Sequence, residues 1–411
     1  MQNPHQDAVY RRYIFYSLLL PLLGLIVLAV VIAIGVGVLR QRVERWGAYQ
    51  KGDFLNADGY HPVTIIRGDD GYIYGVTDSG GIYGHGVLYR LSPQNGAFRL
   101  LHTFDGTFGI GPYALMQAPD GWVYGAAVGN DYYACLTIYR FRPDQDRLEK
   151  AYVLGLDKVS NTSCLLPAGR GCLYGVSEAG GPNNDGVVYE VSLHPHEIHI
   201  LHNFNGMDGL DPFKLIVGRD GMLYGVAKAG GSLRDAGTVF RVAPDGSGFK
   251  VLHVFRGTDG KEPVALIQTQ DGELVGVADH GGRGDGVIFA LKPDGTDFHI
   301  VHQFWPLQAG HMPVTILQAP DGELYGTAQL EGDRGGGDGI VYKMRPDGSH
   351  FQKLHIFRFA DGALPFDLIL DPSGSTLYGT TILGGQGNTG TVFKLNVDGQ
   401  GFQTLHAFSG R

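Results

Sequence analysis

Apolar residues in this chain come in short runs that end at turn-forming residues, and residues 213–255 give the clearest example. An Asp-Gly pair separates the first two runs, and such a pair between apolar runs favours a tight β-hairpin. The first three runs are apolar at nearly consecutive positions, which is typical of strands covered on both faces. The pattern predicts four short strands of one buried sheet, at 213–217, 222–227, 238–242 and 249–255.

The same arrangement recurs seven times, with a Tyr-Gly pair as its marker. Tyrosine precedes the marker glycine in every copy except the fifth, where Val275 stands. The step is about 50 residues, and a repeat of this length without a helical pattern is typical of a toroidal β-propeller with one blade per copy. We therefore predict an all-β, seven-bladed β-propeller of four-stranded blades over residues 54–411, with every blade whole. The marker glycines are Gly75, Gly125, Gly175, Gly225, Gly276, Gly326 and Gly379.

A long uncharged segment precedes the repeats. Residues 13–39 carry no charged side chain and consist mostly of Leu, Ile, Val and Ala. At a rise of about 1.5 Å per residue, such a run is long enough to cross a hydrocarbon layer of roughly 30 Å. We predict a tail at 1–12, one transmembrane helix in the lipid bilayer at 13–39 and a juxtamembrane linker at 40–53. A cleaved signal peptide is the alternative, but the run is too long for its apolar region.

Charge narrows the choice of partner. The formal net charge is -9 and the basic residues are scattered singly, so the chain has no positive stripe that would neutralise phosphates. We expect no nucleic-acid partner. Arg11 and Arg12 flank one side of the apolar segment, while Arg40, Arg42 and Arg45 flank the other. The positive-inside rule therefore leaves the orientation nearly tied.

The order of the turns assigns the connections to two faces of a disc. If the first strand of each blade is innermost, the Asp-Gly and Pro-Asp-Gly hairpins share one face. The Gly-Gly loops and the crossovers between copies then share the opposite face, around the mouth of the central channel. We call this second face the loop face. Its connections are longer and more varied, so we expect a binding site there.

These phrases resemble a known group of repeats. The Tyr-Gly marker, the Gly-Gly pair as at Gly230 and Gly231, and the Leu-His-x-Phe close as at 201–204 are similar to the GloVer tandem-repeat proteins, a bacterial group whose members join this repeat to various surface anchors. The resemblance covers residues 54–410. The double glycine is also kelch-like, although the tryptophan of the kelch motif has no repeated equivalent here. The resemblance implies export and no defined reaction, and with the predicted helix it places the protein in the inner membrane with a periplasmic or extracellular propeller.

Repeated polar residues are interpreted as structural. One histidine per blade would be spread around the ring, whereas metal ligands must converge to about 2 Å from one ion. We expect these histidines to hydrogen-bond between blades, and we expect turn-forming aspartates at Asp208, Asp259 and Asp361, because their spacing lacks the ligands of a calcium loop. We predict no metal site and no cofactor. The repeated histidines are His102, His202, His253, His302, His355 and His406.

The sequence assigns no catalytic residue, since it contains no Gly-x-Ser-x-Gly, no His-Glu-x-x-His and no phosphate-cradling loop. We expect a membrane-anchored binding or scaffold module for a protein or glycan partner, in preference to an enzyme. A polysaccharide hydrolase or lyase with its site at the channel mouth is the alternative. Aromatic rings offer stacking area and polar groups fix orientation. The candidate binding residues on the loop face are Tyr60, His61, Tyr83, His85, Asp131, Tyr132, Tyr133, Arg234, His280, Arg283, Trp305, His311 and Arg334.

Overall fold

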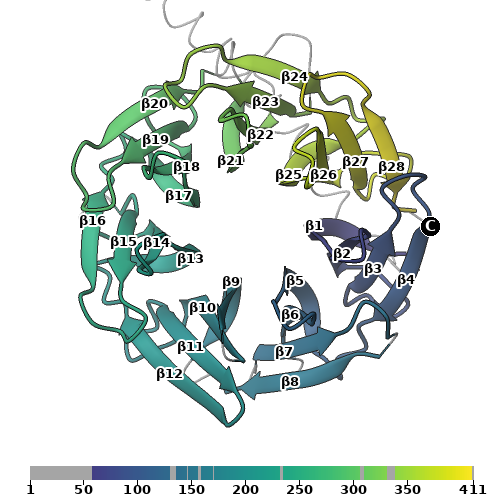
Figure 1. Ribbon diagram of the computed structural model, residues 1–411, viewed down its shortest axis with the longest axis horizontal. Coiled ribbons are helices and arrows are strands. Elements are labelled where there is room, and N and C mark those ends of the chain that lie inside the picture. Colours follow the sequence, from purple (N-terminus) through teal and green to yellow (C-terminus); the bar gives the residue numbers. More distant parts are fainter. Residues whose placement is uncertain are drawn as a thin grey trace, which may run out of the picture. The chain divides into compact units, whose positions relative to one another are not determined.

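The described part of the chain forms seven four-stranded sheets arranged in a ring (Figure 1). Neighbouring strands of each sheet are antiparallel and pair in chain order. The predicted all-β fold of seven four-stranded blades is confirmed. The computed structural model describes residues 58–129, 136–145, 147–155, 159–169, 171–231, 235–305, 310–330 and 338–409.

The blades follow one another in sequence. Blade 1 contains β1 (Tyr60–Arg67), β2 (Ile73–Ser79), β3 (Val87–Leu91) and β4 (Phe98–Thr103). Blade 2 contains β5 (Ile110–Gln117), β6 (Val123–Val128), β7 (Leu136–Phe141) and β8 (Glu149–Leu154). Blade 3 contains β9 (Ser160–Gly169), β10 (Cys172–Ala179), β11 (Val187–Leu193) and β12 (His196–Asn203). Blade 4 contains β13 (Leu210–Val217), β14 (Leu223–Ala229), β15 (Thr238–Val242) and β16 (Lys250–Val254).

The remaining three blades repeat the plan. Blade 5 contains β17 (Lys261–Gln268), β18 (Leu274–His280), β19 (Val287–Leu291) and β20 (His299–Gln303). Blade 6 contains β21 (His311–Gln318), β22 (Leu324–Leu330), β23 (Ile340–Met344) and β24 (Gln352–Ile356). Blade 7 contains β25 (Ala363–Leu370), β26 (Thr376–Leu383), β27 (Thr391–Asn396) and β28 (Gln403–Ala407).

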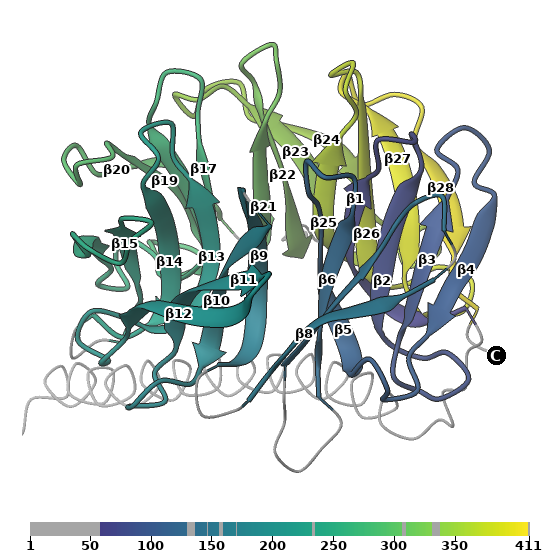
Figure 2. The same ribbon diagram turned by 60° about the horizontal axis from the view of Figure 1, so that its bottom comes forward.

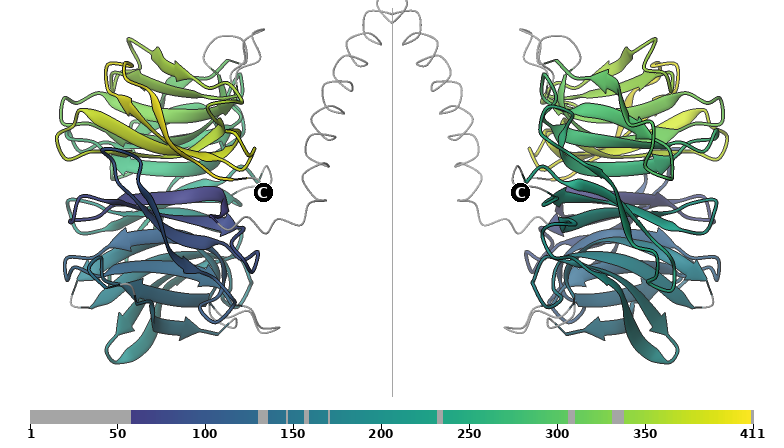
Figure 3. Two further views of the ribbon diagram at one scale, coloured as in Figure 1. Left: turned by 90° about the vertical axis from the view of Figure 1, so that its right-hand side faces the viewer. Right: turned by 90° about the vertical axis from the view of Figure 1, so that its left-hand side faces the viewer.

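The first strand of every blade lies nearest the ring axis and the fourth lies at the rim (Figures 1 and 2). The first strands of neighbouring blades contact one another all the way round, including β25 with β1. Seen edge-on, the strands run between two faces that carry the connections (Figure 3). Because the strands are antiparallel and in order, the two hairpins of each blade share one face, and the second-to-third loop shares the loop face with the crossover.

Contacts within the blade explain both residues of the Tyr-Gly marker. The Tyr224 hydroxyl donates to Asp220 Oδ2 at 2.7 Å, and so ties the second strand to the Asp-Gly hairpin that begins it. A Cβ on Gly225 would lie 2.4 Å from the ring of Phe240 on the third strand, so no side chain fits there. The same geometry occurs in blade 1, where a Cβ on Gly75 would lie 2.2 Å from the Tyr89 hydroxyl oxygen and 2.3 Å from the Tyr89 ring. The marker glycine therefore has a packing role.

The repeated histidines join blades at the rim. His202 stacks on Phe249 of the next blade, with ring centroids 3.4 Å apart, and its Nε2 lies 3.1 Å from Asp208 Oδ2 in the intervening crossover. The backbone N–H of Asn205 donates to Oδ1 of the same aspartate, which therefore also shapes the turn. The turn-forming role of Asp208 is confirmed. The histidine prediction holds only in part, because the contact with the next blade is a ring stack, the hydrogen bond goes to the crossover, and His102 Nε2 and His302 Nε2 have no hydrogen-bond partner among the described residues. The same stack and ion pair recur for His253 with Phe298 and Asp259, His355 with Phe402 and Asp361, and His406 with Phe98 and Asp58.

The ring closes without exchanging a strand, because β1–β4 and β25–β28 form separate sheets. Three kinds of contact join the last blade to the first. The His61 N–H donates to the Thr389 carbonyl at 3.0 Å, His406 pairs with Asp58 at 3.3 Å, and the Ser409 hydroxyl donates to Asp58 at 2.6 Å. The prediction of seven whole blades is confirmed by this pairing.

The predicted tail, transmembrane helix and linker at 1–12, 13–39 and 40–53 lie outside the described residues. Within the part of the chain that the structure describes, no helix is long and apolar enough to cross a membrane.

Candidate binding site at the channel mouth

A central channel of about 660 Å³ runs between the seven innermost strands. Its wall is largely apolar and includes Val63, Tyr113, Phe213 and Phe366. The wall includes three charged residues, which are Glu178 on blade 3, Lys214 on blade 4 and Asp367 on blade 7.

Asp367 has a structural role in the wall. It accepts the N–H of Ile65 on the neighbouring blade at 2.9 Å and the N–H of Leu368 at 2.9 Å. Burial raises the pKa of the Asp367 carboxyl, and these two hydrogen bonds and the Lys214 charge act in the opposite direction. The carboxylate therefore adds a side-chain link to the closure between blades 7 and 1.

Two positions of each blade lie at the loop-face end of the inner strands. One is the residue before the proline of the first strand, and the other follows the proline's partner on the second strand. In blade 3 Thr162 stands in place of the proline and pairs with Ser177. In blade 5, for example, Pro263 pairs with Ala278, so Glu262 and Asp279 occupy the two positions. Glu262 has a φ of 57°, and its N–H donates to the carbonyl of Ala236 on the preceding blade at 3.0 Å. Backbone ties to two blades therefore fix where its side chain begins.

These mouth positions differ from blade to blade, although the backbone around them repeats. Blades 3, 4 and 5, which are neighbours in the ring, carry charged side chains there. Blade 6 carries Met312 and Gln329, and blade 7 carries Leu364 and Ile382. Blade 1 carries His61 and Asp78. The mouth therefore has a charged arc at blades 3 to 5 and a mostly apolar arc at blades 6 and 7, with one further acidic residue on blade 1. The described charged residues of blades 3 to 5 at this level are Glu178, Asp211, Lys228, Glu262, Asp279 and His280, all partly buried.

The charged arc begins with one cation between acidic groups. Lys228 Nζ lies 3.6 Å from Glu178 Oε1 and 3.6 Å from the centroid of the Phe213 ring. Asp211 Oδ1 is a buried atom without a hydrogen-bond partner among the described residues. Burial raises the pKa of the Asp211 carboxyl, Lys228 opposes the rise and Glu262 adds to it. The arc thus holds more carboxylates than cations.

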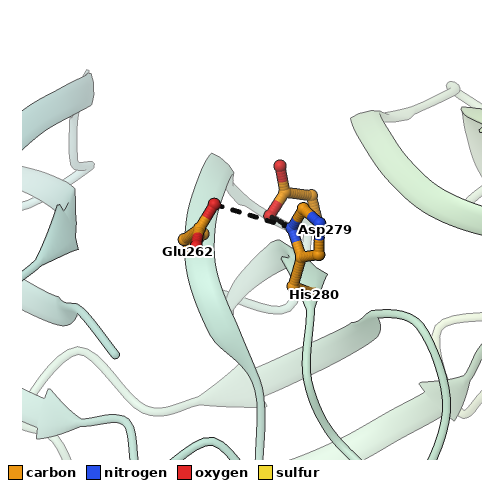
Figure 4. A group of neighbouring side chains, drawn as sticks. All are labelled: Glu262, Asp279 and His280. Carbon is orange, nitrogen blue, oxygen red and sulfur yellow. Dashed lines mark hydrogen bonds and ion pairs between the residues drawn. The ribbon is translucent and has the colours of Figure 1, made fainter. Parts of the chain in front are cut away.

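The arc continues into a tight group on blade 5. His280 Nδ1 lies 2.7 Å from Asp279 Oδ1 and 3.6 Å from Glu262 Oε2 (Figure 4). The hydrogen bond to Asp279 raises the pKa of the His280 imidazole. Burial raises the pKa of the Asp279 carboxyl, while the hydrogen bond to His280 limits that rise. Two partly buried carboxylates and an imidazole therefore face one another at the mouth.

Two more of the predicted histidines, His61 and His311, each lie beside an aspartate. His61 Nδ1 lies 3.4 Å from Asp78 on blade 1, and His311 Nδ1 lies 3.0 Å from Asp285 across the junction of blades 5 and 6. Tyr60 stacks on His61 with ring centroids 3.9 Å apart and is only 6% exposed, so it offers little surface to a ligand.

The other predicted candidates are dispersed. Tyr83 is 53% exposed on blade 1 and Trp305 is 42% exposed in the crossover to blade 6. The carbonyl of His85 accepts the N–H of Gly111, and the N–H of Arg283 donates to the Gln303 side chain, so the backbones of both serve the loops. The structure therefore brings only His280 into the charged arc. The candidates outside the described residues are Asp131, Tyr132, Tyr133, Arg234 and Arg334.

Five residues of the charged arc are absent from the sequence prediction. The signal that identifies them is positional, because each stands at a mouth position whose neighbours repeat while it does not. Aligning the copies on the marker glycine, and on the proline in the copies that have it, exposes this variation without a structure. The residues are Glu178, Asp211, Lys228, Glu262 and Asp279.

A family model confirms the resemblance seen in the repeats. The model of the Gloeobacter/Verrucomicrobia repeat matches residues 49–232, 115–337 and 267–411. The chain belongs to the Gloeobacter/Verrucomicrobia repeat family. No curated protein matches the sequence.

Solved structures similar to this Gloeobacter/Verrucomicrobia repeat protein share its fold. One is the extracellular domain of a protein described as a hybrid two-component system from B. thetaiotaomicron, at 11% identity and a TM-score of 0.56, with 81% of this chain and 38% of that chain covered. A second is oligogalacturonate lyase from Vibrio parahaemolyticus, at 14% identity and a TM-score of 0.56, with 83% of this chain and 90% of that chain covered. A third is a puromycin-hydrolyzing peptidase from Mycobacterium tuberculosis, at 14% identity and a TM-score of 0.61, with 87% of this chain and 54% of that chain covered. At these identities the likeness is one of fold.

Proposed function

We propose that this propeller is a binding module whose channel mouth receives a polypeptide segment with a basic side chain next to an apolar one. The observation that carries the proposal is the division of the mouth. Charged residues occupy variable positions of blades 3 to 5, whereas Met312, Leu364 and Ile382 occupy three of the four variable positions of blades 6 and 7, with Gln329 at the fourth. Blade 1 adds one acidic residue, Asp78. Architecture alone would not require this, because all seven blades keep the same backbone with different residues there.

The charge of the arc favours a cationic group. Glu178 is paired with Lys228, whereas Asp211 has a buried oxygen without a partner in the described region and a neighbouring carboxylate in Glu262. A lysine or arginine side chain of a partner would neutralise this excess and donate to the free oxygen. Exposed rings on the same face, Tyr83 and Trp305, add stacking surface.

The membrane anchor, the extracytoplasmic location and a scaffold role belong to the same proposal. They are supported by the uncharged segment at 13–39 and by the similar fold of an extracellular domain. Proteolysis of spheroplasts, whose outer membrane has been opened, checks the location, since a propeller outside the cytoplasm is cleaved there while cytoplasmic proteins stay protected.

A peptide array tests the recognition. We expect the full-length protein to retain peptides that place Lys or Arg beside an aliphatic or aromatic residue, and to release them as salt rises. Asp211→Asn should lower the affinity at least about tenfold, since it removes a charge-assisted hydrogen bond. Asp245→Asn is the matched control, because it removes one negative charge from a turn on the opposite face. Equal binding by both variants, or retention of glycans in place of peptides, would contradict the proposal.

An enzyme that acts on polysaccharide is the second candidate, and one observation favours it. Asp279 holds the imidazole of His280 at the mouth and raises its pKa, which is the arrangement of a proton-transferring pair. Turnover of a glycan panel that includes polygalacturonate, lost in His280→Ser, would support it. Absence of turnover at every pH tested would contradict the enzyme hypothesis.

A further inference from the structure

Glu262, Asp279 and His280 bring three potential metal ligands together at the mouth of blade 5. Glu262 lies at the start of β17, and the other two residues end the neighbouring strand β18 (Figure 4). Their ligand atoms all lie within 4.8 Å of one another. The set contains an imidazole nitrogen as well as carboxylate oxygens, so it differs from an ordinary exposed acidic patch.

The distances suit a bound ion. With metal–ligand bonds of about 2.1 Å, two neighbouring donor atoms lie about 3.0 Å apart in an octahedron and about 3.4 Å apart in a tetrahedron. His280 Nδ1 lies 2.7 Å from Asp279 Oδ1 and 3.6 Å from Glu262 Oε2, on either side of these values. Small side-chain rotations would therefore convert the present contacts into ligation.

The surrounding charges leave this set available. Lys261 Nζ pairs with the other oxygen of Glu262, Oε1, at 3.2 Å, and Oε2 faces His280. Asp211 of the adjacent blade adds negative charge, and Lys228 pairs with Glu178. The environment is thus net acidic on the side that opens to the mouth.

The blade fold does not require these three residues. At the same three positions blade 6 has Met312, Gln329 and Leu330, and forms the same sheet. Blade 1 has a histidine and an aspartate there, followed by Ser79. The strands that carry the set are nevertheless held firmly, because Pro263 pairs with Ala278 and the Glu262 N–H is bound to blade 4. A preorganised set of ligands that the fold does not need points to a ligand.

We propose that Glu262, Asp279 and His280 form a site for a divalent transition-metal ion at the channel mouth. The imidazole favours Zn²⁺ over Ca²⁺ and Mg²⁺, which take oxygen ligands, and the two carboxylates also suit Mn²⁺. Three protein ligands leave coordination positions open toward the mouth, where water or a carboxylate of a ligand completes the shell. The site goes beyond the proposed peptide recognition and does not depend on it.

Titration of the full-length protein with MnCl₂ and ZnCl₂ after chelator treatment tests the site. Calorimetry gives the stoichiometry and affinity, and the Mn²⁺ electron paramagnetic resonance signal reports the bound fraction independently. The test variants copy residues that other blades tolerate, so the fold is expected to persist: Glu262→Met as in blade 6, Asp279→Gln as in blade 6 and His280→Ser as in blade 1. Circular dichroism checks folding. Asp78→Gln, at the Asp279 position of blade 1, is the matched control.

We expect one ion per chain that each test variant binds at least about tenfold more weakly, while Asp78→Gln binds like the wild type. Lack of stoichiometric binding by the wild type, or unchanged affinity in His280→Ser and Asp279→Gln, would overturn the site. Peptide retention in metal-free buffer is measured separately. If Asp211→Asn loses peptide retention but still binds the ion, peptide recognition and the metal site are separate. They are also separate if a variant that no longer binds the ion still retains the peptide.

Discussion

His302 is the repeated histidine whose environment yields the most quantitative prediction. Its ring stacks on Phe351 with centroids 4.3 Å apart, as in the other blades, but its Nε2 has no hydrogen-bond partner among the described residues. Burial lowers the pKa of this imidazole from 6.5 to about 4. The folded protein therefore keeps His302 neutral where the unfolded chain protonates it.

The direction of the pH effect follows from that difference. Between pH 6.5 and about 4 the unfolded state binds the extra proton, so stability falls as the pH falls through this window. The pKa difference of about 2.5 units, at about 1.36 kcal/mol per unit, gives a full penalty of about 3.4 kcal/mol, of which about 2.5 kcal/mol is present at pH 4.5. Above pH 7 it vanishes.

His302→Phe keeps a flat ring against Phe351 and removes the proton site. We expect its free energy of unfolding in guanidinium to match the wild type at pH 7.5 and to exceed it by about 2.5 kcal/mol at pH 4.5. His253→Phe is the control, because it breaks a 3.1 Å bond to Asp259 and should cost about 1–3 kcal/mol at pH 7.5. If the His302 variant gains nothing at pH 4.5, or if both variants behave alike, the reasoning about burial is wrong.

Two further predictions concern the architecture. Gly225→Val should lower the free energy of unfolding by about 1–3 kcal/mol in guanidinium melts, because its Cβ meets the Phe240 ring at 2.4 Å, whereas Gly221→Asn, in an open turn with φ 78°, should cost less than about 1 kcal/mol. Equal losses would contradict the packing argument. Removing the chain from Phe402 onward deletes β28 and exposes the edge of β27, so light scattering should reveal aggregation. A monodisperse truncated protein would refute it.

The repeating part of the structure could be predicted from the sequence because each repeated residue makes a local contact. The Tyr224 hydroxyl reaches an aspartate four residues earlier, and Gly225 meets the adjacent strand, so one copy contains the information for its own blade. Seven copies then determine the ring. The stack of His202 on Phe249 has equivalents at four other junctions among the described residues, so contacts between blades also follow the repeat.

The mouth could be predicted only in part. His280 stood out as a non-repeated histidine, whereas Glu262 looked like an ordinary acidic residue before a proline. Its approach to Asp279 depends on a bulge between Pro263 and Ala265 and on a left-handed backbone at Glu262, and neither is visible in the hydrophobic pattern. Partner and metal preference depend on these side-chain distances, so residue types alone did not determine them.

The carboxylate of Asp58 is the first described side chain of the propeller, and it also holds His406 and Ser409 of the last blade. Any load transmitted from the leading segment thus arrives at the seam of the ring before it reaches another blade. We therefore expect a pulling force on this segment to strain the contacts of Asp58 with blade 7 before it strains blades 3 to 5, which carry the charged arc.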